Sequence, residues 1–181
     1  MALMGTAQRT SDGTVWWITG LSGAGKSTIA RLVQQGLRLR GRPALLLDGD
    51  VLRSLLGRTE GYDADERRRL AMIYARLARE VAGQGIEAVC ATISMFHAVR
   101  AWNRANIPNY REIYLRVPVA ELESRDPRAL YANARAGSTT NLVGIDLAAE
   151  EPLEADLVID NFGPTSPQDA ADRILALADR R

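Results

Sequence analysis

The sequence has very little cysteine, histidine and lysine. One cysteine, Cys90, and one histidine, His97, occur among 181 residues. A single cysteine cannot close a disulfide within the chain, and its place in an apolar stretch predicts a small buried side chain in a reducing compartment. Because histidines and cysteines do not cluster, we expect no zinc site, and we expect His97 to be a surface or packing residue.

The chain also lacks a strong charge bias and a long apolar run. Its formal net charge is +1, so bulk electrostatics favours neither nucleic acid nor a membrane surface. Residues 1–13 lack the apolar core of a signal peptide, and no stretch reaches the length of a transmembrane helix. We therefore predict a cytoplasmic protein with a flexible tail over residues 1–13 and a single domain over residues 14–181.

The only lysine, Lys26, stands in a motif. Residues 20–27 fit G-x-x-x-x-G-K-[ST], the P-loop, between an apolar strand-like stretch and a helical pattern, and this context argues against a chance match. In such a loop backbone N–H groups converge on phosphate oxygens, Lys26 can reach the β- and γ-phosphates, and the Ser27 hydroxyl can ligate Mg²⁺. The predicted ATP site comprises Gly20, Ser22, Gly23, Ala24, Gly25, Lys26, Ser27 and Thr28.

Two carboxylates follow the second predicted strand. Residues 44–47 are apolar, and Asp48-Gly49-Asp50 comes directly after them. The carboxyl end of a parallel strand is where open α/β sheets bind ligands, so these groups could organise Mg²⁺ or accept a proton from an attacking hydroxyl. A simple turn is the alternative. We assign Asp48 to the metal and Asp50 to catalysis.

The remaining pattern alternates strands and helices. Strands are predicted over residues 15–19, 44–47, 86–93, 111–117 and 157–159, with helices after the P-loop, from 63 to 83, from 96 to 107 and from 166 onward. The helix from 63 shows an apolar stripe of Leu70, Ile73, Tyr74, Leu77 and Val81. This order predicts an α/β P-loop kinase fold, a five-stranded parallel sheet with helices on both faces.

A long polar connection lies between the fourth and fifth strands. It covers about residues 125 to 150, and in a compact domain such a connection is typical of a lid. Its arginines suit the clamping of phosphates as a lid closes, and we assign Arg125 and Arg128 to the ATP site.

Several motifs together resemble adenylyl-sulfate kinases. They are Gly-Leu-Ser-Gly-Ala-Gly-Lys-Ser-Thr (20–28), Leu-Asp-Gly-Asp-Val-Leu-Arg (47–53), Arg-Asp-Pro-Arg-Ala-Leu-Tyr (125–131), Ala-Arg-Ala-Gly (134–137) and Asp-Leu-Val-Ile-Asp (156–160), in the family's order. The resemblance implies transfer of the ATP γ-phosphoryl group, with Mg²⁺, to the 3′-hydroxyl of a small nucleotide. In the family's main members this acceptor is adenylyl sulfate. Because relatives are often dimers, the resemblance leaves a homodimer open.

The resemblance also implies roles for the acceptor side. Asp50 and Arg53 would face the acceptor nucleotide, Tyr62 would stack on its base, and Arg67 would hold its phosphate-side charge. Ile93 and Ser94 match the family's stretch at the end of the third strand, with Ser94 as the serine that follows it.

The sequence departs from the family only on this acceptor side. Leu70 stands in place of an asparagine, Leu142 in place of a second stacking phenylalanine, and Met95-Phe96 in place of Pro-Tyr. Some family members that share such stretches resemble kinases for a cytidine nucleotide carrying a phosphoramidate, as in cytidine diphosphoramidate. Adenylyl sulfate is the preferred prediction and the cytidine nucleotide the alternative. A nucleotide-binding protein without catalysis is a third reading.

Overall fold

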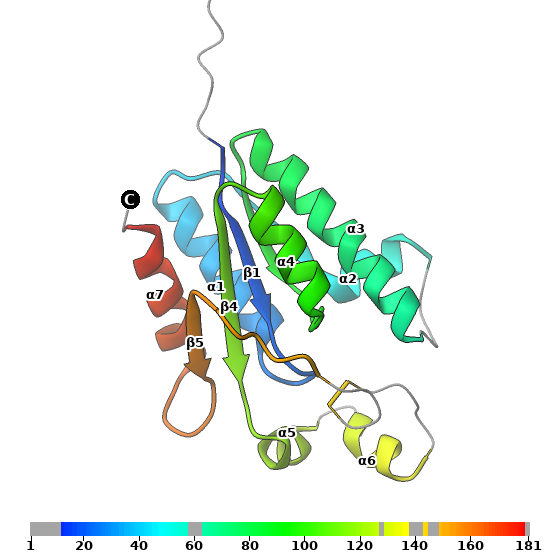
Figure 1. Ribbon diagram of the computed structural model, residues 1–181. Coiled ribbons are helices and arrows are strands. Elements are labelled where there is room, and N and C mark those ends of the chain that lie inside the picture. The colour runs from blue at the N-terminus through cyan, green and yellow to red at the C-terminus, as the bar shows by residue number, and fades with distance from the viewer. Residues whose placement is uncertain (1–11, 58–62, 127–128, 138–142, 145–148, 180–181) are drawn as a thin grey trace, which may run out of the picture.

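The computed structural model describes residues 12–57, 63–126, 129–137, 143–144 and 149–179 (Figure 1). Its sheet has five strands in the order β2-β3-β1-β4-β5, and every neighbouring pair is parallel. The strands are β1 (Val15–Thr19), β2 (Ala44–Asp48), β3 (Glu87–Ala91), β4 (Tyr110–Arg116) and β5 (Leu157–Asp160). The predicted five-stranded parallel sheet is confirmed.

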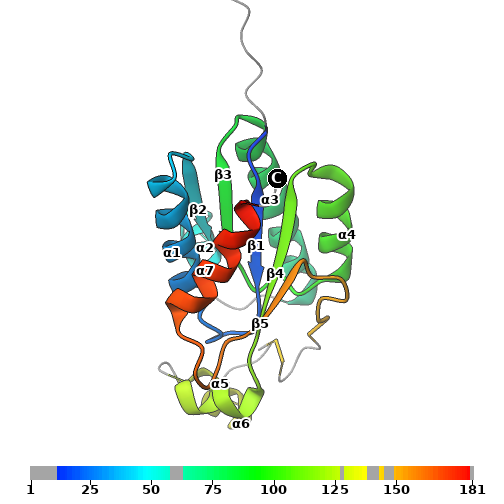
Figure 2. The same cartoon turned by 90° about the vertical axis from the view of Figure 1, so that its left-hand side faces the viewer.

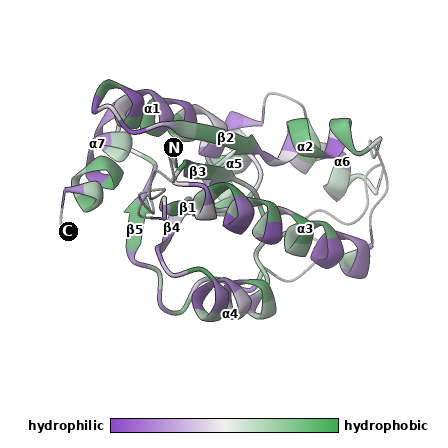
Figure 3. Ribbon diagram, turned by 90° about the horizontal axis from the view of Figure 1, so that it is seen from above, coloured by the Kyte–Doolittle hydropathy of each residue, from purple (hydrophilic) through white to green (hydrophobic). Residues whose placement is uncertain are grey.

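Helices cover both faces of this sheet, as predicted. The helices are α1 (Lys26–Leu39), α2 (Gly49–Leu55), α3 (Ala64–Gly83), α4 (His97–Asn106), α5 (Val119–Arg125), α6 (Leu130–Arg135) and α7 (Pro167–Ala178). Helices α1 and α7 lie on one face, and α3 and α4 lie on the other (Figures 2 and 3). Helices α5 and α6 lie beyond the carboxyl ends of the strands, on the same side as the P-loop (Figure 1).

The strand β1 is the centre of the core because both of its faces are buried. Trp16 and Ile18 belong to the apolar cluster under α1 and α7, whereas Val15 and Trp17 belong to the cluster under α3 and α4. Successive side chains of a strand point to opposite faces, so a strand covered on both sides favours apolar residues at successive positions, here Val15 to Ile18. This explains the unbroken apolar run directly before the P-loop.

The buried face of α3 differs from the predicted stripe. Leu70, Tyr74 and Val81 are buried as expected, but Ile73 and Leu77 are 42% and 38% exposed. The other buried residues of this helix are all alanines, namely Ala71, Ala75, Ala78 and Ala82. The prediction was wrong because it counted only large side chains, whereas small ones bring a helix close to a sheet.

Helix α2 was not predicted. The Asp48 side chain accepts a hydrogen bond from the Asp50 backbone N–H at 2.9 Å and so caps this seven-residue helix. The stretch read as strand end and turn is therefore a strand end followed by a helix start. Within the described part of the chain, no helix combines the length and apolar character that crossing a membrane requires.

Candidate nucleotide-binding site

The P-loop connects β1 to α1, and neighbouring residues pack closely against two of its glycines. Gly25 has a φ of +87°, and a Cβ atom there would lie 2.8 Å from the Asn161 side-chain nitrogen. A Cβ atom on Gly20 would lie 2.6 Å from the Leu115 carbonyl oxygen. Both positions therefore require glycine. The resulting loop at the start of α1 has the backbone form that holds phosphate groups.

Lys26 is held against the loop itself. Its Nζ donates a hydrogen bond to the Leu21 carbonyl at 2.7 Å. Burial lowers the pKa of this lysine to about 7, an effect that the Asp48 carboxylate opposes and the Arg53 guanidinium reinforces. Phosphate oxygens beside Lys26 would favour its charged form, which is the state that phosphoryl transfer needs.

The two carboxylates after β2 occupy different environments. Asp48 is only 6% exposed and accepts the capping bond described above, whereas Asp50 is on the first turn of α2 and forms an ion pair with Arg53. No group of three or more histidine, cysteine, aspartate or glutamate side chains gathers as a metal site among the described residues. Mg²⁺ beside a nucleotide usually takes one or two protein oxygens and completes its shell with phosphates and water. Ser27 and Asp48 fit such a site, and their assignment to the metal remains a prediction.

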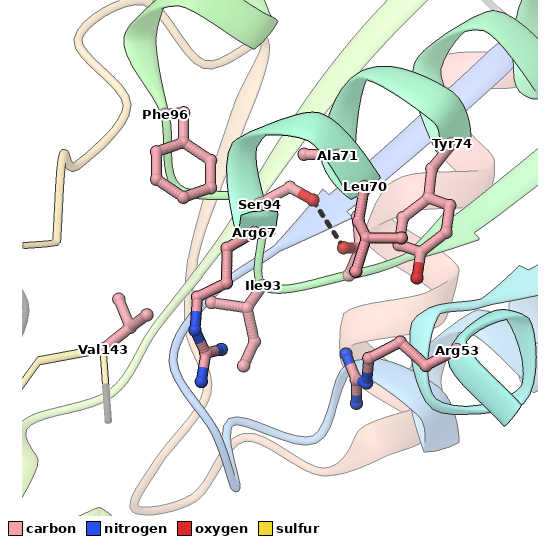
Figure 4. Close-up of a pocket in the computed structure, with 10 residues that line it drawn as sticks. Arg53, Arg67, Leu70, Ala71, Tyr74, Ile93, Ser94, Phe96 and Val143 are labelled. Atoms are coloured by element: carbon pink, nitrogen blue, oxygen red, sulfur yellow. Dashed lines mark hydrogen bonds between the residues drawn. The ribbon is translucent and has the colours of Figure 1, made fainter. Parts of the chain in front are cut away.

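A pocket opens between α2, α3 and the segment that follows β3 (Figure 4). Its lining is Arg53, Arg67, Leu70, Ala71, Tyr74, Thr92, Ile93, Ser94, Phe96 and Val143. The structure thus brings together five residues that the sequence assigned to the acceptor: Arg53, Arg67, Leu70, Ile93 and Ser94. Figure 4 shows the Arg53 and Arg67 guanidinium groups pointing toward the same side of this pocket.

The segment after β3 is held in an unusual backbone conformation. Ser94 has a φ of 25°, which non-glycine residues rarely adopt, and its hydroxyl lies 2.6 Å from the Thr92 hydroxyl. The Thr19 hydroxyl also donates to the Ile93 carbonyl. Strain of this kind persists where surrounding contacts impose it, and it is common at functional sites. Here it sets the Ser94 hydroxyl into the pocket lining.

The side chains of Met95 and Phe96 lie in different parts of the structure. Phe96 lines the pocket, but Met95 is 2% exposed and packs in the core under α1 and α7. The expectation that this whole substitution lies on the acceptor side is therefore wrong for Met95. Leu70 has two roles, because it lines the pocket and also belongs to the core under α3.

Arg125, which the sequence assigned to the ATP site, is held by a residue of its own helix, α5, and by the residue that follows β5. Arg125 pairs with Glu121 at 2.9 Å and donates to the Asn161 carbonyl at 3.0 Å. Arg128, Tyr62 and Leu142 lie outside the described residues. The roles assigned to all four remain predictions.

Sequence reasoning missed residues that support the site. The Tyr131 hydroxyl donates to the Ser22 carbonyl at 2.8 Å, and Asn161 Nδ2 donates to the Ala24 carbonyl at 2.9 Å. Tyr131 stands in a motif that carries the resemblance, and Asn161 directly follows the last strand at the ligand edge. Position alone could have marked Asn161, whereas nothing local indicated that Tyr131 reaches the P-loop.

Known proteins match most of the chain. A family model described as adenylylsulphate kinase matches residues 12–160. The cytidine diphosphoramidate kinase of Campylobacter jejuni is 40% identical over 145 residues, which are 80% of this chain and 84% of that protein. The adenylyl-sulfate kinase of Pseudomonas aeruginosa is 38% identical over 164 residues, covering 90% and 83%.

A solved structure extends the likeness to three dimensions. The APS kinase of Mycobacterium tuberculosis, in complex with AMPPNP and APS, superimposes with a TM-score of 0.85 at 32% identity, covering 93% of this chain and 98% of the other. The matched residues include the P-loop, the pocket after β3 and the last strand of the sheet. The chain belongs to the adenylylsulphate kinase family.

Proposed function

We propose that the protein transfers the γ-phosphoryl group of ATP to the 3′-hydroxyl of a nucleotide, and that its acceptor is adenylyl sulfate. The product would be 3′-phosphoadenylyl sulfate, the activated form of sulfate. One observation carries this proposal: a pocket lined by two arginines, Arg53 and Arg67, lies close to the P-loop, since the Arg53 guanidinium acts electrostatically on Lys26. The pocket supplies apolar surface for a base and positive charge for an anionic group on the same acceptor.

The residues divide the work of the reaction. The P-loop amides and Lys26 bind the β- and γ-phosphates and stabilise charge as the phosphoryl group leaves. Asp50, held by Arg53 on the first turn of α2, accepts the proton of the attacking hydroxyl. Arg67 binds the acceptor's anionic group, while Ser94 and the apolar side chains position its sugar and base. Mg²⁺, when bound through Ser27 and Asp48, supplies positive charge at the phosphates.

A cytidine nucleotide carrying a phosphoramidate is the second candidate. Two observations favour it: the 40% identity to the Campylobacter jejuni kinase, and the apolar Leu70 in the pocket. A smaller base needs less stacking surface than adenine, and Leu70 offers contact without a hydrogen bond. Adenylyl sulfate remains preferred because the family model and most of the family motifs point to it.

A panel of acceptors tests the proposal. Adenylyl sulfate, AMP, CMP and cytidine diphosphoramidate are each offered with ATP and Mg²⁺, and ADP release is followed. We expect the highest kcat/KM with adenylyl sulfate and no turnover once Mg²⁺ is chelated. Preference for cytidine diphosphoramidate establishes the second candidate, and ATP binding that no acceptor converts into ADP release establishes a non-catalytic nucleotide-binding protein. A cytoplasmic location and a homodimer remain predictions from the sequence.

A further inference from the structure

Two side chains from distant parts of the chain hold the outer side of the P-loop. Tyr131, on α6, donates its hydroxyl hydrogen to the Ser22 carbonyl at 2.8 Å. Asn161, directly after β5, donates from Nδ2 to the Ala24 carbonyl at 2.9 Å. Both side chains are buried, with 2% and 6% exposure. The Asn161 hydrogen bond is buried and the Tyr131 hydrogen bond is partly buried, so competition from water is reduced at both.

Fixing these carbonyls also fixes the N–H groups that bind phosphate. In a planar trans peptide the C=O and the next N–H point in opposite directions. Holding the Ser22 carbonyl outward thus turns the Gly23 N–H to the other side of the loop, and holding the Ala24 carbonyl does the same for the Gly25 N–H. Such inward N–H groups are what a P-loop presents to phosphate oxygens.

The backbones of both residues are themselves held by hydrogen bonds to the lid region. Asp126 accepts hydrogen bonds from the Leu130 and Tyr131 backbone N–H groups at 2.8 and 2.7 Å, which fixes the start of α6. The Asn161 carbonyl accepts from Arg125 at 3.0 Å. Burial raises the pKa of Tyr131 to about 12, so its hydroxyl remains a donor at neutral pH. The lid helices and the P-loop are thereby connected by hydrogen bonds.

We propose that Tyr131 and Asn161 are positioning residues that shape the phosphate loop for a nucleoside triphosphate and couple that shape to helix α6. They act through the Ser22 and Ala24 carbonyls, so the loop has its binding form before the nucleotide arrives. The proposal rests on the proposed use of ATP as donor. Hydrogen exchange measured on the ligand-free protein tests the role of Tyr131 and Asn161 separately from the identity of the donor.

The first experiment removes one hydroxyl. Tyr131→Phe is compared with the matched control Tyr110→Phe, since Tyr110 is also a buried tyrosine, with a hydroxyl that accepts a hydrogen bond from Asn103. Tyr110 is the first residue of β4 and therefore lies at the amino ends of the strands, away from the P-loop. Hydrogen exchange is measured on the peptide covering residues 20–28 without ligand, and AMPPNP affinity is measured by calorimetry. For Tyr131→Phe we expect faster exchange there and about 3- to 10-fold weaker binding, the effect of one hydrogen bond.

The second experiment tests whether both side chains act on one loop. Asn161→Ala should also accelerate exchange of residues 20–28 and weaken AMPPNP binding. The double variant should lose less than the product of the two single effects, because the second change releases a loop that the first has already loosened. In steady-state assays the KM for ATP should rise in each variant while the KM for the acceptor stays constant.

Two outcomes overturn the proposal. One is exchange and AMPPNP affinity in Tyr131→Phe that equal those of Tyr110→Phe. The other is a lower melting temperature with unchanged exchange and affinity, which would make the two residues merely structural. Failure of the unaltered protein to bind AMPPNP would instead refute ATP as donor, and the exchange measurement would still decide whether Tyr131 and Asn161 shape the loop.

Discussion

The two halves of the site are built in different ways. The proposed phosphate half is a single stretch, residues 20–28, whose backbone N–H groups would bind the phosphates, and two of its carbonyls accept hydrogen bonds from Tyr131 and Asn161. The acceptor half is a pocket of side chains that reach in from residues as far apart as Arg53 and Val143. Backbone geometry tolerates few changes, whereas a pocket wall can change its chemistry without disturbing the fold. Substrate choice can therefore diverge while the phosphate site stays the same.

The largest predicted loss of kcat follows from replacing Asp50, the proposed base for the acceptor hydroxyl. Asp50→Asn keeps the shape of the side chain but removes the base, so kcat should fall by about 10²- to 10⁴-fold. Affinity for AMPPNP should remain nearly unchanged, because Asp50 lies on α2, outside the P-loop, and forms an ion pair with Arg53. Steady-state kinetics and calorimetry check both.

The control for this change is Asp65→Asn, since Asp65 forms an exposed pair with Arg68 on α3 and should leave kcat unaltered. Equal turnover in Asp50→Asn and the unaltered protein would show that Asp50 is not the catalytic base and only forms part of the first turn of α2.

On the phosphate half, Lys26→Ala should lower kcat by about 10²- to 10³-fold, the usual cost of removing one group that stabilises transition-state charge. The loss should be equal for every acceptor in the panel, because Lys26 lies in the P-loop and does not line the pocket. Circular dichroism and thermal melting verify that the variant is folded. A loss that differs between acceptors would contradict the division into two halves.

On the acceptor half, Arg67→Ala should weaken acceptor use by about 10- to 150-fold, corresponding to one charge-assisted hydrogen bond. The KM for ATP should remain nearly constant. Arg69→Ala is the matched control, since Arg69 is exposed on the same helix and does not line the pocket. If Arg67→Ala changed the KM for ATP more than the KM for the acceptor, Arg67 would belong to the phosphate half and not to the acceptor half.

How well the sequence predicted the site follows the same division. The P-loop, the five strands and five of the pocket residues were predictable because each depends on a local pattern or a family motif. Helix α2 was missed because its start is set by one capping bond from Asp48, which also reads as a turn. Tyr131 was missed because its partner is a carbonyl far away in the sequence, and no local pattern encodes such a contact. The position of Asn161 directly after the last strand could have marked it as a site residue, but its partner, the Ala24 carbonyl, is equally far away in the sequence.

The phosphate half should also respond to pH. With a pKa of about 7 in the free protein, Lys26 is largely neutral above that pH, and the phosphates of a nucleotide favour its charged form. Binding therefore takes up a proton above pH 7, and AMPPNP affinity should fall by up to about tenfold per pH unit between pH 7.5 and 9.

Calorimetry in two buffers of different ionisation enthalpy measures this uptake, which should approach one proton at pH 8. Lys26→Arg, which stays charged, should abolish the uptake. Binding of AMPPNP to the unaltered protein without proton uptake would mean that Lys26 is already charged in the free protein.

The smallest expected effect concerns the identity of the acceptor, which the pocket wall should set. Leu70→Asn introduces a group that can hydrogen-bond an adenine nucleotide, as the family's asparagine does, and it should raise the ratio of kcat/KM for adenylyl sulfate over cytidine diphosphoramidate by about 3- to 10-fold. Leu70→Met, which keeps volume and polarity close to leucine, should leave the ratio unchanged. Because Leu70 is 7% exposed and also packs in the core under α3, both variants should lose thermal stability, and only the ratio isolates the effect on recognition. An unchanged ratio in Leu70→Asn would show that Leu70 does not select the base, and the choice of acceptor would then depend on the other residues that line the pocket.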